Sequence, residues 1–72
     1  DAEIVEFYVK ENSLITRHKV KEMNLPNEAN IGGIVRAGEG VLVNGDTQII
    51  AGDLVVVFCK SHVIRTLERY FK

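Results

Sequence analysis

A run of six apolar residues, Leu54 to Cys59, is the most informative pattern along the chain. It follows Gly52 and Asp53, and this pair predicts a tight turn because glycine adopts positive φ without steric cost and aspartate bonds nearby backbone N–H groups. A strand with no polar position needs cover on both of its faces. We therefore predict a central strand over Leu54 to Cys59 that begins at the turn and is covered on both sides.

The first half of the chain predicts a strand, a short helix and a second strand. Apolar positions recur from Ala2 to Val9 with acidic residues between them, which is typical of a half-exposed strand. A short helix is expected from Thr16 to Asn24, because threonine is a suitable N-cap and Pro26 prevents continuation. A strand resumes from Ile31 to Val35, and two adjacent glycines within it indicate a bulge or a close backbone approach.

The second half predicts a hairpin, the central strand and a closing helix. A glycine-rich turn leads into a strand from Val41 to Val43. Asn44 and Gly45 then form the favoured pair for a two-residue type I′ turn, so Thr47 to Ile50 is the expected return strand. Ser61 is the expected N-cap of the final helix. That helix carries an apolar stripe made of Val63, Ile64, Leu67, Tyr70 and Phe71.

These elements predict a two-layer α+β fold in the order β-α-β-β-β-β-α, a small mixed sheet with its helices on one face. Residues 1–72 form a single domain. Because the chain begins with Asp1 instead of Met, we expect it to be a fragment of a longer protein. An edge strand near Ile31, or the short strand containing Val41 and Val43, needs cover from a partner, because exposed strand edges invite pairing.

Composition excludes several classes of function. The net charge is −1 with both signs interspersed, which argues against a partner that is a nucleic-acid polymer. No apolar segment is long enough for direct membrane insertion. The single Cys59 and two histidines give neither a disulfide nor a metal site, and the apolar setting of Cys59 predicts an inert, buried thiol. No catalytic constellation can be assembled, so we do not expect an enzyme.

The order of these segments resembles the TrkA C-terminal domain, also called the C-terminal RCK domain (regulator of potassium conductance). The resemblance covers nearly the whole chain, from the acidic strand at 3–7 through the strand at 31–36 to the closing helix. Its most specific part is the order of Gly45-Asp46-Thr47 followed by Gly52-Asp53-Leu54. The chain departs from the family near Thr16, where members usually have a glycine.

The resemblance implies a cytosolic module that senses a ligand, dimerises and regulates a potassium uptake system or other cation transport system. Such domains lie behind a nucleotide-binding Rossmann domain or at the cytosolic end of a membrane transporter subunit. They pair as homodimers, and some members bind cyclic di-AMP in the dimer cleft. The expected ligand is therefore cyclic di-AMP or another small anionic molecule, with no cofactor in the domain. The alternative is a purely structural oligomerisation domain without a ligand.

The candidate ligand-binding residues all lie in or beside the strand at 31–35. Arg36 ends this strand before a glycine-rich turn, where its planar guanidinium could face a phosphate; the alternative is a surface pair with Glu39. The resemblance also places a ligand-contacting arginine in roughly this region. Asn30 and Ile31 would flank the same cleft, and Ile31 or Ile34 could pack on an adenine ring; the alternative for each is plain core or rim.

The remaining polar candidates have ordinary interpretations. His18 and His62 are expected at the surface, since the sequence shows no nearby acidic partner for either. Asp53 is expected to act as a turn residue, because no second carboxylate, histidine or lysine lies at catalytic spacing.

Overall fold

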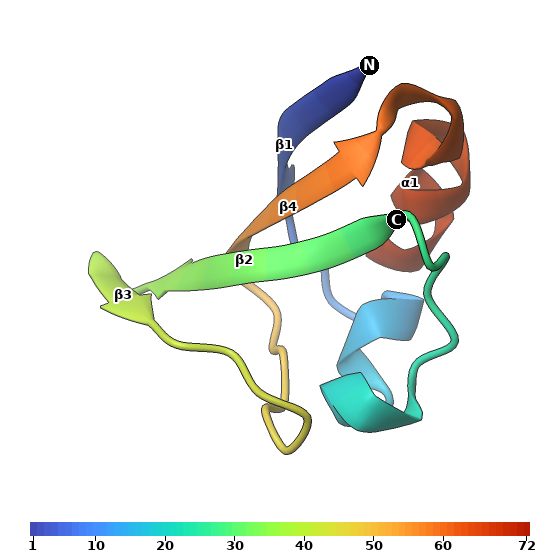
Figure 1. The fold of residues 1–72 in the computed structure, drawn as a ribbon. Coiled ribbons are helices and arrows are strands. Elements are labelled where there is room, and N and C mark those ends of the chain that lie inside the picture. The colour runs from blue at the N-terminus through green and yellow to red at the C-terminus, as the bar shows by residue number, and fades with distance from the viewer.

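The apolar run after Gly52 forms β4 (Leu54–Lys60), and this strand lies between β1 (Ala2–Tyr8) and β2 (Ala29–Arg36). The computed structural model describes residues 1–72. A fourth strand, β3 (Glu39–Val41), pairs with β2, so the strand order in the sheet is β1-β4-β2-β3. The sheet that we expected to be mixed is antiparallel at all three pairings. The two-layer α+β class is confirmed, with α1 (Ile64–Phe71) beside the sheet (Figure 1).

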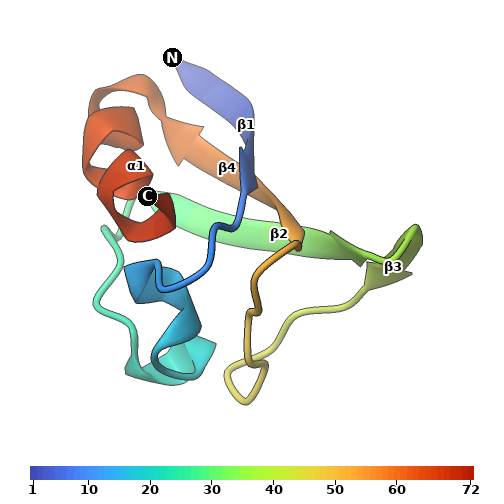
Figure 2. The same cartoon turned by 180° about the vertical axis from the view of Figure 1, so that it is seen from behind.

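One face of the sheet holds the core. Along β4, Val55, Val57 and Cys59 are buried and alternate with residues that point to the other face. On that other face Phe58 keeps 47% of its surface exposed. Figures 1 and 2 show α1 and the short helical turns on one side of the sheet only. The prediction of a central strand is confirmed, but the expected cover on both faces is wrong within this chain.

The closing helix packs its predicted stripe against the sheet. Val63, Leu67 and Phe71 are buried in the same cluster as the core residues of β4. The ring of Phe71 stacks on Phe7 of β1, with ring centroids 4.4 Å apart and planes at 2°. Ser61 is not the cap that we expected, because it opens the short 3-10 turn η3 (Ser61–Val63) and its hydroxyl donates to the backbone oxygen of Asp1.

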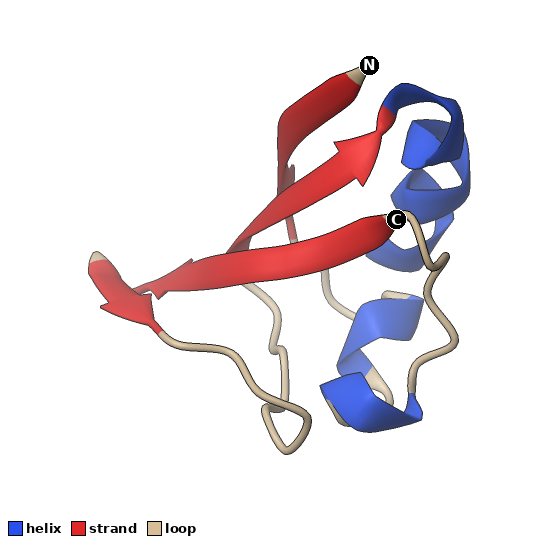
Figure 3. Ribbon diagram, viewed as in Figure 1, coloured by secondary structure: helices blue, strands red, loops and turns tan.

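The helix expected from Thr16 to Asn24 is replaced by two 3-10 turns, η1 (Leu14–Thr16) and η2 (Val20–Glu22), which lie below α1 (Figure 3). The reason lies in the backbone hydrogen bonds. The N–H of Val20 donates to the oxygen of Thr47 at 3.0 Å, and the N–H of Lys21 donates to that of Gly45 at 2.8 Å. These donors are therefore taken by a distant segment and cannot continue a helix.

The hairpin predicted at Asn44 and Gly45 is also wrong. Neither residue has positive φ, which a type I′ turn requires at both central positions. Instead, the N–H of Asp46 donates to Asn44 Oδ1 at 2.8 Å, an Asx turn, and Gln48 pairs with Lys19 in place of the expected strand 41–43. The true two-residue hairpin joins β2 to β3 through Ala37 and Gly38, with φ of 51° and 80°.

The adjacent glycines of β2 form the predicted bulge. The pairing with β4 shifts by one residue between Ile31 and Gly33. A Cβ on Gly32 would strike the ring of Phe58, so the bulge lets this ring lie against the backbone of β2. The edges of the sheet are β1 and β3. The strand that contains Ile31 is β2, which lies inside the sheet, so the prediction of an edge strand there is wrong. The chain contains no helix long and apolar enough to cross a membrane.

The hairpin geometry predicts opposite effects for two alanine-to-glycine substitutions. Ala37→Gly should raise the free energy of unfolding by about 0.5 kcal/mol, because it relieves an alanine held at positive φ. Ala51→Gly should lower it by about 0.5–1 kcal/mol, because Ala51 is exposed and outside that region, so only chain entropy changes. Urea unfolding measures both, and equal destabilisation by the two variants would contradict the turn assignment.

Candidate functional site

The uncovered face of the sheet carries several exposed apolar side chains. The strand registers place Ile4 and Tyr8 of β1, Phe58 of β4 and Val35 of β2 on this face. Their exposed fractions are 70%, 71%, 47% and 38%, respectively. Half-buried Leu54 and Val56 also point there, and the face includes the charged residues Glu6 and Lys60. Exposed apolar side chains that cluster on one face are typical of interaction sites.

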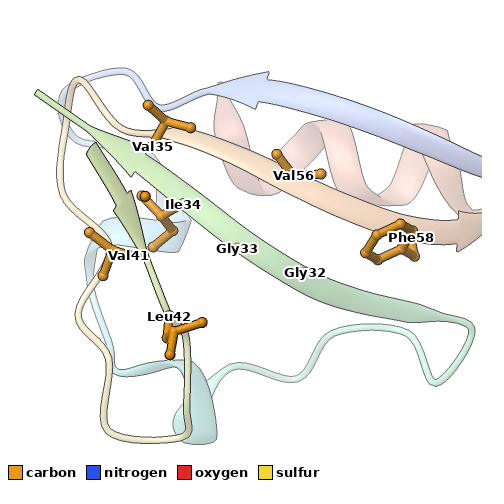
Figure 4. A pocket seen from close by; sticks show the side chains of 9 residues that line it. Gly32, Gly33, Ile34, Val35, Val41, Leu42, Val56 and Phe58 are labelled. Carbon is orange, nitrogen blue, oxygen red and sulfur yellow. The ribbon is translucent and has the colours of Figure 1, made fainter. Parts of the chain in front are cut away.

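A hollow of about 410 Å³ lies in the outer face, where β2, β3 and β4 meet (Figure 4). Three glycines form part of its floor, and no charged side chain lines it. At its edge stands Leu42, which is 92% exposed, the highest value among the large hydrophobic residues. The lining residues are Gly32, Gly33, Ile34, Val35, Gly40, Val41, Leu42, Val56 and Phe58.

A second, more polar hollow of about 320 Å³ lies beyond Phe58, at the beginning of β2. It offers an amide from Asn30, a cation from Lys60 and an aromatic ring from Phe58. Phe58 lines both hollows and so separates the apolar one from the polar one. The lining residues of this polar hollow are Ala2, Asn27, Glu28, Asn30, Phe58, Cys59 and Lys60.

The four candidate ligand residues do not come together in one subunit. Asn30 and Arg36 lie six positions apart on β2, which is roughly 20 Å along a strand. Ile34 is only 2% exposed and belongs to the core, and Ile31 is half-buried against it. Of the four, only Asn30 is exposed at a hollow of the outer face, and the role of each in ligand binding stays a prediction.

Arg36 instead makes a bidentate ion pair with Asp53. Its Nε donates to Asp53 Oδ1 at 2.8 Å and its Nη2 donates to Asp53 Oδ2 at 2.8 Å. The Nη2 group also donates to the backbone oxygen of Gln48 at 3.0 Å. The carboxylate is 1% exposed and the guanidinium side chain 35%, so the pair closes the edge of the core. The alternative surface pair with Glu39, its cross-strand neighbour in the hairpin, does not form, because Asp53 engages the guanidinium instead.

The buried carboxylate is held ionised by its partners. Hydrogen bonds from Arg36 lower the pKa of Asp53 most strongly; burial opposes this, and the N–H of Ile50 lowers it further. That N–H donates to Asp53 Oδ2 at 3.0 Å, which confirms Asp53 as a turn residue. The ion pair is not among the contacts expected from the sequence. The available signal was a carboxylate directly before an apolar strand, which must be buried with that strand and needs a cation.

The other reactive side chains have structural settings. Cys59 is buried as predicted, and this burial raises the pKa of its thiol. His62 Nε2 lies 3.6 Å from Glu28 Oε2, so this histidine has an acidic neighbour that the sequence did not reveal. Nowhere in the chain do three His, Cys, Asp or Glu side chains come together in a way that could hold a metal ion.

Sequence comparison gives one family for nearly the whole chain. A model of the TrkA-C domain family matches residues 4–72. The Trk system potassium uptake protein TrkA homolog 1 of Methanosarcina mazei is 34% identical over 71 residues, 99% of this chain and 16% of the relative. The TrkA homolog of Archaeoglobus fulgidus is 36% identical over 69 residues, 96% of this chain and again 16% of the relative. The chain thus spans about one sixth of these two proteins.

Structure comparison agrees on the fold. A solved structure of an RCK domain with cda superposes with a TM-score of 0.79 at 17% sequence identity. The match covers 96% of this chain and 97% of that one. At this identity the similarity establishes the fold alone.

The ion pair predicts an acid-dependent loss of stability. Asp53→Asn should lower the free energy of unfolding by about 1–3 kcal/mol at pH 7, discounted because Arg36 is partly exposed. The pKa of Asp53 is lower in the folded chain than in the unfolded chain, where it is about 3.9. The contribution of the ion pair to the free energy of unfolding is therefore complete above about pH 3.9. It is lost as the pH falls from there through the pKa of the folded chain. The deficit of the variant should therefore shrink below about pH 4 in urea unfolding experiments.

Asp46→Asn is the matched control for this substitution. Asp46 pairs with Lys21 at 2.8 Å, but both side chains are more than half exposed, so its loss should cost no more than about 0.5 kcal/mol. A deficit of Asp53→Asn that equals the control, or that persists unchanged at pH 3, would contradict the structural role of the pair.

Proposed function

This chain belongs to the TrkA-C domain family, and from that premise we propose that it is a cytosolic regulatory module of a potassium uptake system. In this proposal, two copies pair through the outer face of the sheet and a small anionic ligand binds beside that contact. Ligand binding then favours one arrangement of the pair, which regulates transport, provided that the ligand binds the two arrangements unequally.

The single observation that carries the proposal is the bare apolar face of the sheet. Ile4, Tyr8, Val35 and Phe58 come from three strands, so the surface is too broad for one small ligand to cover. A stable pair needs about 600–800 Å² from each subunit. That is about an eighth to a sixth of the accessible surface of 4829 Å². Sheets that pack face to face are a common architecture.

The relatives indicate the setting of the module. Those from Methanosarcina mazei and Archaeoglobus fulgidus are named as potassium uptake proteins and extend well beyond the matched region. We propose that a Rossmann domain or a membrane transporter subunit is attached to this chain and receives the signal. The polar surface outside the sheet face, including the exposed side of α1, leaves room for such a connection.

The polar hollow at the beginning of β2 suits a small anionic ligand. Lys60 supplies a cation for a phosphate, Asn30 an amide for a base edge, and Phe58 a ring for stacking. An RCK domain of the same fold was solved with cda, which supports a ligand in this fold. We keep Arg36 as a further candidate, because its Nη1 makes no hydrogen bond within the chain.

If two copies pair through the outer face of the sheet, a single negative charge placed on that face should dissociate them. Phe58→Asp should shift the chain from twice its mass of 8.1 kDa to the monomer mass. The dissociation constant of the pair should rise by about 100-fold or more, because pairing would bury a carboxylate without a partner. Leu14→Asp is the control, since Leu14 is similarly exposed at 44% but lies in η1. Sedimentation equilibrium at tens of micromolar measures both. A monomeric parent chain, or equal loss in both variants, would exclude this interface.

Ligand sensing predicts a rise in melting temperature with cyclic di-AMP. At a concentration one hundred times the dissociation constant, binding contributes about 2.7 kcal/mol, which raises the melting temperature by about 11–22 °C in a domain of this size. Asn30→Ala should abolish most of the rise, whereas Asn24→Ala, also exposed but outside the hollow, should retain it. AMP and inorganic phosphate serve as comparison ligands. No shift with millimolar cyclic di-AMP would favour a purely structural oligomerisation domain.

A further inference from the structure

The glycine hollow is not explained by the single chain. Gly33 and Gly40 both have φ outside the positive region, so neither backbone requires glycine. A Cβ on Gly40 would meet nothing within 4 Å, and one on Gly33 would only reach the oxygen of Val41 at 3.8 Å. Glycine weakens a strand, and it often marks the place where another backbone or ligand approaches closely. Neither the backbone conformation nor a contact within the chain therefore accounts for these two glycines.

Leu42 projects from the same part of the outer face in which the glycines leave a recess. It is an apolar side chain that is 92% exposed and stands at the rim of the hollow, directly after β3 (Figure 4). Burying a leucine side chain is worth about 1.5–3 kcal/mol, so its exposure is unfavourable in an isolated subunit. The patch thus carries both an apolar projection and an apolar recess.

We propose that two copies of this chain exchange Leu42, so that the side chain of each subunit occupies the glycine hollow of the other. A two-fold interface brings the same patch of both subunits together, so a projection and a recess on one patch satisfy each other twice and the contact closes. The absence of charge from the lining fits an apolar side chain and disfavours a phosphate or a lipid headgroup. This inference rests on the pairing proposed above and specifies which side chain of each subunit contacts the other subunit.

Two substitutions alter the two halves of the contact separately. Leu42→Ala removes the projection and should weaken pairing by about 100-fold or more, because the contact occurs twice. Gly40→Val fills the recess, and the free space around Gly40 lets the folded subunit accept it. Each variant should melt cooperatively at low concentration. Ile50→Ala is the control, since Ile50 is 45% exposed but lies away from the hollow, and it should pair like the parent chain.

Mixing the two variants gives the decisive test. In the mixed pair, Leu42 of the Gly40→Val subunit enters the open recess of its partner, and the filled recess meets only alanine. Sedimentation velocity with one fluorescently labelled variant should therefore find a heterodimer at least about tenfold tighter than either homodimer. Should Gly40→Val fail to fold, Gly33→Ala replaces it, because the nearest atom to its Cβ lies at 3.8 Å.

The outcomes separate this inference from the proposed pairing. A heterodimer no tighter than the homodimers, or an unimpaired Leu42→Ala homodimer, overturns the exchange but leaves the sheet interface standing. A parent chain that is monomeric at every concentration tested overturns both. A heterodimer preferred over both homodimers supports the exchange, because only a reciprocal contact is restored by combining its two separate defects.

Discussion

A central strand with cover on one side only is the constraint on which this structure depends. β4 forms hydrogen bonds with β1 and β2, and its apolar residues alternate between the two faces of the sheet. The chain has one α-helix, and that helix covers the face of Val55 and Val57. A domain of this size buries only about 60% of the surface that its unfolded chain exposes. The apolar residues of the outer face therefore stay exposed in the single chain.

Polar contacts cover the core at the end of β2, next to the start of β4. Arg36 at the end of β2 reaches the carboxylate of Asp53 before β4 and the backbone of Gln48 in the preceding loop. Gln48 in turn donates from its side chain to the backbone oxygen of Thr16 at 2.8 Å. One guanidinium thus connects the sheet with the loop and, through Gln48, with the 3-10 turns. These polar contacts all lie on the core side of the sheet, while the outer face stays uncovered.

Local patterns in the sequence were sufficient for the elements whose hydrogen bonds are local or pair with a neighbouring strand. The strand at Leu54, the closing helix and the bulge all follow from residue type and spacing. The helix over Thr16 to Asn24 failed because a distant loop takes its N–H donors, and the turn at Asn44 failed because asparagine also forms Asx turns. The ion pair of Arg36 joins residues 17 positions apart, and no spacing rule predicts such a contact. The hollow likewise depends on three strands meeting, which a linear pattern does not display.

Isotope-filtered NMR reports whether a second copy of the chain covers the outer face. A sample that mixes ¹³C-labelled and unlabelled chains reports only contacts between subunits. Pairing through the outer face should give intermolecular NOEs from the methyl groups of Val35, Leu42 and Val56, all of which line the hollow of that face. The absence of intermolecular NOEs at millimolar concentration, or NOEs confined to α1 residues such as Ile64, would contradict it.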